Sequence, residues 1–404
     1  MAELAKTGAA APVRAGGTAQ GPVVLQVVPS LETGGVERGT VDVAAAVVAA
    51  GGVAVVASSG GVMVRELERA GGIHVTLPVH SKNPVVMARN VARLRRLIED
   101  YGVDIVHARS RAPAWSARAA ARRTAKPFVT TFHGTYGHGN AVKRWYNSVM
   151  TRGDLVIAIS DFIADHIRET YRVAEDRVRV IHRGVDLDLL SPDRVSAERV
   201  IQLAKRWSLT EGMPVVMLPG RLTRWKGQAL LIEALARLGR HDIRCVLVGS
   251  DQGRRRYRAQ LERLVRRRRL DAIVLFAGDC RDMPAAYMLA DVVVSASTDP
   301  EAFGRVAAEA QAMGRPVAAS DHGATRETVL AGRTGWLYPP GKADALAQAI
   351  GKALALTTGE RERLAEVAIA HTRANFSKEK MCAEVLAVYE ELLQAAAGGQ
   401  AEAG

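Results

Sequence analysis

Cysteine is scarce in this sequence. The 404 residues include three, Cys245, Cys280 and Cys382, and none of them forms a CxxC pair. An odd count without paired spacing predicts buried free thiols in a reducing compartment. No apolar run approaches the ~20 residues that a membrane-spanning helix needs. Residues 1–21 are rich in Ala and Gly and lack the apolar core of a signal peptide, which predicts a disordered lead-in and a cytoplasmic protein.

Acidic and aromatic residues are also under-represented. Lys and Arg outnumber Asp and Glu by 55 to 42, which gives a net charge of +13, and aromatic residues make up 5%. Such a surface attracts phosphates on nucleic acid, anionic lipid or an activated sugar. The densest runs, 254–269 and 89–96, fit helices with solvated basic faces. Few aromatics lie between these cations, which argues against a stacking platform for single-stranded nucleic acid, so no nucleic-acid partner is expected.

Apolar strand candidates alternate with amphipathic segments along the whole chain. In the first half they are VVLQVV, VAVVAS, HVTLPV, DIVHARS, FVTTFHG and LVIAIS; in the second, VVMLPG, CVLVGS, IVLFAG, VVVSAS, PVAAS and GWLYP. Uninterrupted apolar strands separated by helices are typical of parallel sheets covered on both faces. The pattern occurs twice in a chain too long for one hydrophobic core, so it predicts an α/β fold of two Rossmann-like domains facing across a cleft.

The predicted domain boundary lies in a polar, turn-rich stretch near residue 190. It separates a first domain at 22–190 from a second domain at 191–375. A C-terminal helix is expected at 376–396, with packing back on the first domain as one possibility, followed by a flexible tail at 397–404.

Two cations follow a strand in "LPGRLTRWKGQALLIEALARL". The strand ends at Gly220, Arg221 comes next, and Lys226 precedes an amphipathic helix. Arg offers a fork of donors and Lys a point charge, a combination suited to a diphosphate. The GxxxxGK[ST] spacing of a P-loop is missing. Taken alone, the stretch fits a diphosphate clamp and two surface cations beside a turn about equally.

A pair of carboxylates surrounds a glycine in "DPEAFGRVAAEA". Gly304 is expected to turn the chain into a helix over residues 305–313, whose first amides would form an anion site. Glu301 precedes the turn, and Glu309 lies about one turn inside the helix, where its carboxylate can accept hydrogen bonds from a ribose diol. The alternative is that Glu301 is an ordinary acidic residue of a loop and Glu309 a solvated residue of the helix.

In order along the second half, "GRLTRWKG", "CVLVGS", "VLFAG", "ADVVVSASTDPEAFGRVAAEAQAMGRPVAAS", "HGATRE" and "GRTGWLYPPGKADALAQAI" resemble the donor-binding domain of family 4 glycosyltransferases. These are retaining enzymes of the GT-B fold. The resemblance covers residues 215–350 and implies that Glu301 lies near the transferred sugar and Glu309 near the nucleotide ribose. It implies that Arg221 and Lys226 hold the diphosphate. Further implied donor contacts are Gly249, Phe303, Gly304 and Arg305.

Two positions depart from the family pattern. The usual Glu-Ala-Met-Ala has Gln311 in its third place, and the usual Gly-Gly before the later Glu reads Gly323-Ala324. Neither change removes a charge, although Ala324 raises the question of how closely the backbone approaches the sugar phosphate. Glu327, the later Glu, is a further candidate for donor contact.

The first half resembles the acceptor side of the same family. "PSLETGGVERGT" places Gly34 and Gly35 between a strand and a helix, where backbone can approach a ligand closely. The resemblance implies that this glycine loop binds the donor, facing its phosphate and the acceptor. "TTFHGTYG" ends a strand at His133, and the resemblance implies an active-site histidine there, so the candidate catalytic residues are His133 and Glu301. Asp186 and Asp188 spell DxD but lie far from the donor motifs, so we predict no metal site and no cofactor.

These features predict a metal-independent, retaining hexosyltransferase that uses a nucleotide diphosphate sugar. The resemblance implies a glycan or glycolipid acceptor of the cell envelope, with lipopolysaccharide or surface polysaccharide as the product. Basic faces at 89–96 and 118–126 would then contact the anionic inner face of the membrane. Two alternatives stay open: a small soluble acceptor, and a basic nucleic-acid-binding protein on a Rossmann scaffold.

Overall fold

The computed structural model describes residues 21–137 and 139–401, and the chain forms two compact units. The first unit comprises the chain up to Ile159, Ile163–Ile181, and the chain from Met381 onward. The second comprises Ser160–Phe162 and His182–Lys380. The predicted lead-in at 1–21, except its last residue, and the last residues of the chain, 402–404, lie outside the described residues.

The first unit contains a seven-stranded parallel sheet in the order β3-β2-β1-β4-β5-β6-β7. Its strands are β1 Val23–Val27, β2 Val53–Ser58, β3 Ile73–Thr76, β4 Ile105–Ala108, β5 Phe128–Phe132, β6 Leu155–Ala158 and β7 Val178–Val180. The helices are α1 Gly35–Ala49, α2 Val64–Arg69, α3 Pro84–Tyr101, α4 Arg111–Arg123, α5 Ala141–Asn147 and α6 Asp161–Tyr171, with 3-10 turns η1 Ser148–Thr151 and η2 Glu175–Arg177. The first two residues of α6 belong to the second unit.

The second unit contains a six-stranded parallel sheet in the order β10-β9-β8-β11-β12-β13. Its strands are β8 Val215–Pro219, β9 Arg244–Val248, β10 Val274–Gly278, β11 Val292–Ser295, β12 Val317–Ser320 and β13 Gly335–Tyr338. The helices are α7 Ala197–Arg206, α8 Gln228–Leu238, α9 Arg255–Arg267, α10 Met283–Leu289, α11 Arg305–Ala312, α12 Thr325–Thr328, α13 Ala343–Leu354 and α14 Thr358–Asn375, with 3-10 turns η3 Pro192–Arg194 and η4 Arg224–Lys226.

These two sheets confirm the predicted α/β fold of two Rossmann-like units. Each strand candidate from the sequence forms a strand, and the inner strands are apolar enough to be covered on both faces, whereas the edge strands β3 and β10 are only partly buried. Strand β7 was not among the predicted strands, since three residues that include Arg179 carry too little pattern. In each sheet the order reverses beside the first strand of the unit, and ligands of open α/β sheets bind beyond the carboxyl ends of the strands at this point.

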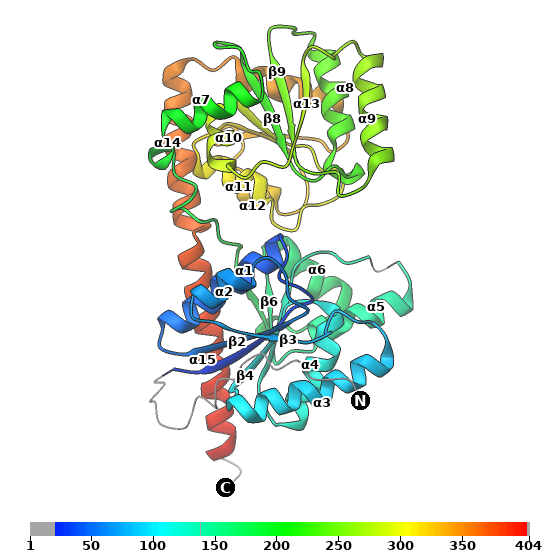
Figure 1. Ribbon diagram of the computed structural model, residues 1–404, viewed down its shortest axis with the longest axis vertical. Helices are drawn as coiled ribbons and strands as arrows, with labels where there is room; N and C mark the ends of the chain where they lie inside the picture. Colours follow the sequence, from blue (N-terminus) through cyan, green and yellow to red (C-terminus); the bar gives the residue numbers. More distant parts are fainter. Residues whose placement is uncertain (1–20, 138, 402–404) are drawn as a thin grey trace. The chain divides into compact units, whose positions relative to one another are not determined.

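The last helix, α15 (Lys378–Ala401), completes the core of the first unit (Figure 1). Its buried apolar residues join the cluster that contains β1, β4 and β5; they include Met381, Val385, Val388 and Leu392. The helix continues to Ala401, where the sequence predicted a tail from residue 397. Alanine-rich sequence propagates a helix at little cost.

Two further sequence expectations can be compared with the structure. Cys245 and Cys382 are buried free thiols, as expected, whereas Cys280 is only half-buried. Cys280 follows the end of β10, at the edge of the second sheet, where fewer elements cover it. Among the described residues, no helix is long and apolar enough to cross a membrane.

A buried polar chain fastens α15 to the sheet of the first unit. His107 Nδ1 lies 2.7 Å from Tyr389 Oη, and His107 Nε2 lies 2.7 Å from Thr131 Oγ1. Burial, with the nearby charge of Arg109 as a lesser cause, holds the pKa of His107 well below its ordinary value. The imidazole is therefore neutral and links β4, β5 and α15 by hydrogen bonds alone.

We expect Tyr389→Phe to destabilise the protein by about 1–3 kcal/mol, because it leaves one ring nitrogen of His107 buried without a partner. Urea unfolding followed by circular dichroism measures this change. Tyr101→Phe is the matched control, since Tyr101 is half-buried at the end of α3. Equal stability of the two variants would show that the bond to His107 does not fasten α15.

Candidate functional site

The loop after β8 lies so close to the residues that follow β11 that only glycine fits at position 227. Gly227 has φ +74°, and a Cβ built on it would lie 1.8 Å from the carbonyl oxygen of Ala296, just past β11. Trp225 O accepts a hydrogen bond from Thr298 N at 2.7 Å. The loop after β8, which includes η4, is thus held against the end of β11 within the second unit.

This contact places Lys226 beside Glu301. Lys226 Nζ lies 2.5 Å from Glu301 Oε1, and the two side chains are 18% and 13% exposed. Ser297 Oγ donates to the same carboxylate oxygen. Within the described part of the chain, these side-chain hydrogen bonds go to Oε1, so Oε2 keeps its capacity to accept one. The structure therefore brings together two residues that lie 75 positions apart in the sequence.

The backbone of Glu301 is held by the loop after β12. Ala324 N donates to Glu301 O at 2.9 Å, and residues 301 and 323 form a parallel bridge. Gly323 has φ +61°, and a Cβ there would lie 2.4 Å from Glu301 O, so glycine is needed at this position. Ala324 has φ −72° and fits without strain. Alanine at 324, in place of the second glycine of the family pattern, therefore leaves the close backbone contact between Gly323 and Glu301 intact.

Gly304 starts helix α11, as the sequence predicted. It has φ +85°, which favours glycine, and it is the N-cap of Arg305–Ala312. A Cβ at this position would lie 3.1 Å from Thr328 Oγ1, so the turn is also crowded. The first amides of a helix have no partner within it, and together with the helix dipole they attract an anion.

Glu309 lies on α11 and is fixed by two neighbours. Arg305 Nε donates to Glu309 Oε1 at 2.5 Å, and Tyr287 Oη donates to Oε2 at 2.8 Å. Burial, helped by the charge of Glu309, raises the pKa of Tyr287 well above its ordinary value, so its phenol keeps its proton. Each carboxylate oxygen retains a lone pair for a further donor. No motif pointed to Tyr287, which reaches this site from α10.

His322 is a second residue that sequence reasoning did not assign. It follows β12, and its ring Nε2 is buried with no hydrogen-bond partner among the described residues. Burial lowers its pKa, although the charges of Glu301 and Asp321 oppose the shift. The result is a neutral imidazole near Glu301 with one ring nitrogen free. Its place in "HGATRE", directly before Gly323, was the signal available in the sequence.

The remaining residues of the second unit that were predicted to contact the sugar donor differ in which of their groups could reach a ligand. The side chain of Arg221 is exposed after β8. Gly249 has φ +143°, and a Cβ there would lie 2.2 Å from Gly220 O, so it allows two strand ends to meet. Phe303 is 4% exposed. Its ring packs against His182 and Phe376, so only its backbone could reach a ligand.

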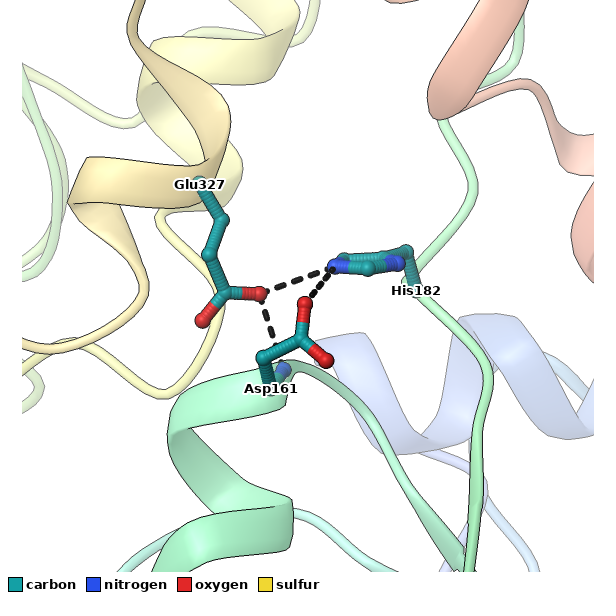
Figure 2. A group of neighbouring side chains, drawn as sticks. All are labelled: Asp161, His182 and Glu327. Carbon is teal, nitrogen blue, oxygen red and sulfur yellow. Dashed lines mark hydrogen bonds and ion pairs between the residues drawn. The ribbon is translucent and has the colours of Figure 1, made fainter.

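Glu327 already has three protein partners in the second unit (Figure 2). Its carboxylate accepts from Asp161 N at 2.9 Å, from Phe162 N at 2.8 Å and from His182 Nε2 at 2.8 Å. Burial opposes ionisation, but these hydrogen bonds prevail and hold the pKa of Glu327 below its ordinary value. The geometry indicates a structural role for Glu327, and contact with a donor stays an untested prediction.

Asp161, His182 and Glu327 also form a group whose potential metal-ligand atoms lie within 4.8 Å of one another. The two backbone N–H groups that face Glu327 belong to the first turn of α6, which is the positive end of that helix. This environment favours the carboxylate and opposes a cation. We therefore keep the prediction of no metal ligands.

Three predicted residues lie in the first unit. Gly34 is the N-cap of α1 with extended backbone, and a Cβ there would lie 2.3 Å from a Glu37 carboxylate oxygen. Gly35 begins the helix. His133 follows β5, and its backbone N–H lies 3.4 Å from the phenol of Tyr136. His133 comes directly after β5, and Gly34 and Gly35 lie where the connection that follows β1 enters α1, and α/β sheets bind ligands in the connections that follow their strands.

Both halves of the chain match known protein families. Residues 33–189 match the family described as Glycosyltransferase Family 4, and residues 201–371 match Glycosyl transferases group 1. A curated relative, the D-inositol 3-phosphate glycosyltransferase of Xylanimonas cellulosilytica, is 32% identical over 310 residues. The match spans 71% of this chain and 72% of the relative.

Solved structures resemble the chain over nearly its whole length. A glycosyltransferase from Rickettsia africae is 37% identical, with a TM-score of 0.86 over 92% of this chain and 99% of its own. Anabaena HepE in complex with UDP-glucose is 25% identical, with a TM-score of 0.80 over 91% and 99%. The two Rossmann-like units match those of GT-B glycosyltransferases, as the sequence resemblance implied.

The contacts of Glu327 predict a pH-dependent contribution to stability. Because its pKa is lowered in the folded protein, the stabilisation is fully present above the ordinary carboxyl value of 4.5 and is lost as the pH falls below it. Glu327→Gln should lower the free energy of unfolding by about 1–3 kcal/mol at neutral pH, with a smaller difference in acid. Urea unfolding at several pH values measures both quantities. Glu362→Gln, an exposed position on α14, is the control; a loss independent of pH would contradict the assignment.

Proposed function

The chain belongs to the glycosyltransferases that combine a Family 4 region with a group 1 region, and we propose that it transfers a hexose from a nucleotide diphosphate sugar with retention of configuration. The observation that carries this proposal is the Lys226–Glu301 pair beside the N-terminus of α11. A nucleotide-sugar donor is further supported by the likeness to HepE, which was solved with UDP-glucose.

The electrostatics of the second unit suit a diphosphate next to a sugar. The positive charge of Lys226 compensates the negative charge of Glu301, so the Glu301 carboxylate could lie close to the diphosphate. Arg221 extends from the same loop, and the amides at the start of α11 attract negative charge. As the bond to the sugar breaks, charge develops on the departing diphosphate, and these groups would stabilise it without a metal ion.

The open oxygen of Glu301 is the group that we assign to the sugar. Oε1 is occupied by Lys226 and Ser297, so Oε2 would accept a hydrogen bond from a sugar hydroxyl and support the positive character of the reacting carbon. Neutral His322 offers a donor or an acceptor nearby. Glu309 would hold the ribose hydroxyls through the lone pairs that Arg305 and Tyr287 leave free.

For the acceptor we propose a glycan or glycolipid of the cell envelope, with lipopolysaccharide or surface polysaccharide as the product. His133 would be a catalytic residue, and the Gly34–Gly35 turn would contact the donor and face the acceptor. Support comes from the basic surface of the first unit, where Arg89, Arg93, Arg122 and Arg123 are exposed. This surface would attract the anionic cytoplasmic leaflet.

A small soluble acceptor is the second candidate. A specific observation favours it: the relative at 32% identity is a D-inositol 3-phosphate glycosyltransferase, whose name indicates a small phosphorylated acceptor. A role in binding nucleic acid has no such support, because it explains the positive charge and leaves the Lys226–Glu301 arrangement unexplained.

Glu301→Gln tests the role of this carboxylate with little change in shape. We expect kcat to fall by about 10²–10³-fold, because the charge that supports the transition state is lost. The measurement is release of nucleoside diphosphate from UDP-glucose or GDP-mannose in the presence of acceptor extract. Glu262→Gln removes another ion-paired glutamate of the second unit, on α9, and should leave kcat unchanged. Full activity of Glu301→Gln would refute this role.

A further inference from the structure

A groove in the second unit, separate from the carboxylates described above, is surrounded by arginine. It lies between helices α8 and α9, which are neighbours in this unit (Figure 1). The cavity has a volume of about 400 Å³, a size that suits a small molecule. Three cations and three apolar side chains line it: Arg224, Arg263, Arg267, Ala229, Leu261 and Leu264. We call this cavity the α8–α9 groove.

The positive charge of the α8–α9 groove has no acidic partner in the protein. Residues 252–270 contain nine arginines and a single acid, Glu262. Glu262 is paired with Arg258 at 3.0 Å, and Glu233 on the neighbouring α8 is paired with Arg268 at 2.8 Å. Among the described residues, no carboxylate forms an ion pair with any of the three arginines that line the groove. Their charge is therefore left for an anion from outside the protein.

The three guanidinium groups approach the groove from two elements. Arg263 and Arg267 are four residues apart on α9, so they lie on the same side of that helix. Arg224 belongs to η4, and its guanidinium lies 5.4 Å from the centre of the Tyr257 ring. Arg224 Nη2 also donates to Gln260 Oε1 at 2.8 Å. Guanidinium groups offer paired N–H donors that match the oxygens of a phosphate.

The wall of the groove is connected to the loop that contributes to the candidate donor site. Arg224 and Lys226 belong to the same 3-10 turn. Tyr257 Oη donates to Gln228 Oε1 at 3.4 Å, and Gln228 Nε2 donates to Arg221 O at 3.0 Å. Burial raises the pKa of Tyr257, so its phenol keeps the proton that it donates. Contacts with α9 therefore hold both ends of the loop that carries Arg221 and Lys226.

We propose that the α8–α9 groove binds a small phosphorylated molecule and that this molecule is an effector of donor binding. Its phosphate lies among the three guanidinium groups, and its apolar part lies against Leu261 and Leu264. The bound anion holds Arg224, and with it the turn that carries Lys226, so the donor site is better ordered and binds its ligand more tightly. By linkage, the donor tightens binding of the effector by the same factor.

The shape of the groove favours a small molecule over nucleic acid. A single strand needs exposed aromatic rings on which its bases can stack. Tyr257 is the aromatic residue in the wall of the groove, and it is 9% exposed. From sequence, residues 254–269 were expected to form a solvated basic face. The groove was not predicted, because Arg224 comes from a turn that lies about thirty residues earlier in the chain.

The effector role rests on the proposed function, whereas binding of the anion does not. The probe for the groove is phenyl phosphate, which joins a phosphate to an apolar ring and contains neither a sugar hydroxyl nor a diphosphate. Titration calorimetry with the full chain should show that the wild type binds phenyl phosphate and does not bind phenol. Arg263→Gln/Arg267→Gln should weaken binding by about tenfold or more, because two charge-assisted contacts are lost.

Arg255→Gln/Arg266→Gln is the matched control, since it removes the same charge from exposed positions of α9 outside the groove. It should bind phenyl phosphate nearly as well as the wild type, and circular dichroism checks that both variants are folded. Equal losses in the two double variants would reveal general attraction to α9 and overturn the inference. Binding that Lys226→Met loses and Arg263→Gln/Arg267→Gln keeps would place the probe in the donor site, and would overturn it as well.

The effector role is measured by titration of UDP-glucose or GDP-mannose with and without saturating phenyl phosphate. Affinity of the wild type for the donor should rise by about fivefold, and Arg263→Gln/Arg267→Gln should show no such rise. An unchanged or weakened donor affinity with the groove occupied would refute the effector role. Absence of donor binding under both conditions would count against the proposed function, while the phenyl phosphate titration decides separately whether the groove binds an anion.

Discussion

The close approach of the loop after β8 to the end of β11 is the constraint on which the site of the second unit depends. Glycine at 227 allows the loop after β8 to lie against β11, and this contact brings Lys226 within 2.5 Å of Glu301. A partly buried ion pair is weak evidence for a stabilising role, because desolvation offsets much of its attraction. In the proposed function its value would be electrostatic, because the positive charge of Lys226 would reduce the repulsion between the Glu301 carboxylate and a bound diphosphate.

The same principle explains the other carboxylates of the second unit. Glu309 is paired with Arg305 and held by Tyr287, whereas Glu327 is paired with His182 and with two backbone N–H groups. Each carboxylate is thus stabilised by different partners and serves a different purpose. Glu301 retains an open oxygen, Glu309 retains lone pairs on both oxygens, and Glu327 is committed to the protein itself.

Much of the fold and part of the site could be predicted from the sequence. The alternation of apolar strands and amphipathic helices indicated two parallel sheets, and Gly304 was expected to start a helix that the structure has at Arg305–Ala312. The partners could not be predicted, because they come from distant elements: Tyr287 from α10 and His322 from the end of β12. For Phe303 and Glu327, a local motif could not predict which groups the side chain contacts. Their motifs suggested ligand contact, while the structure gives their side chains protein partners that no local pattern reveals.

The central claim is that Lys226 permits Glu301 and a diphosphate to share one site. A double-mutant cycle tests it directly, with binding of UDP-glucose or GDP-mannose measured by thermal shift and titration calorimetry for Lys226→Met, Glu301→Gln and both together. The account predicts that Lys226→Met alone weakens binding by about tenfold or more, since it leaves an uncompensated carboxylate beside the phosphates. Adding Glu301→Gln should then restore part of the affinity. Strictly additive losses would contradict the account.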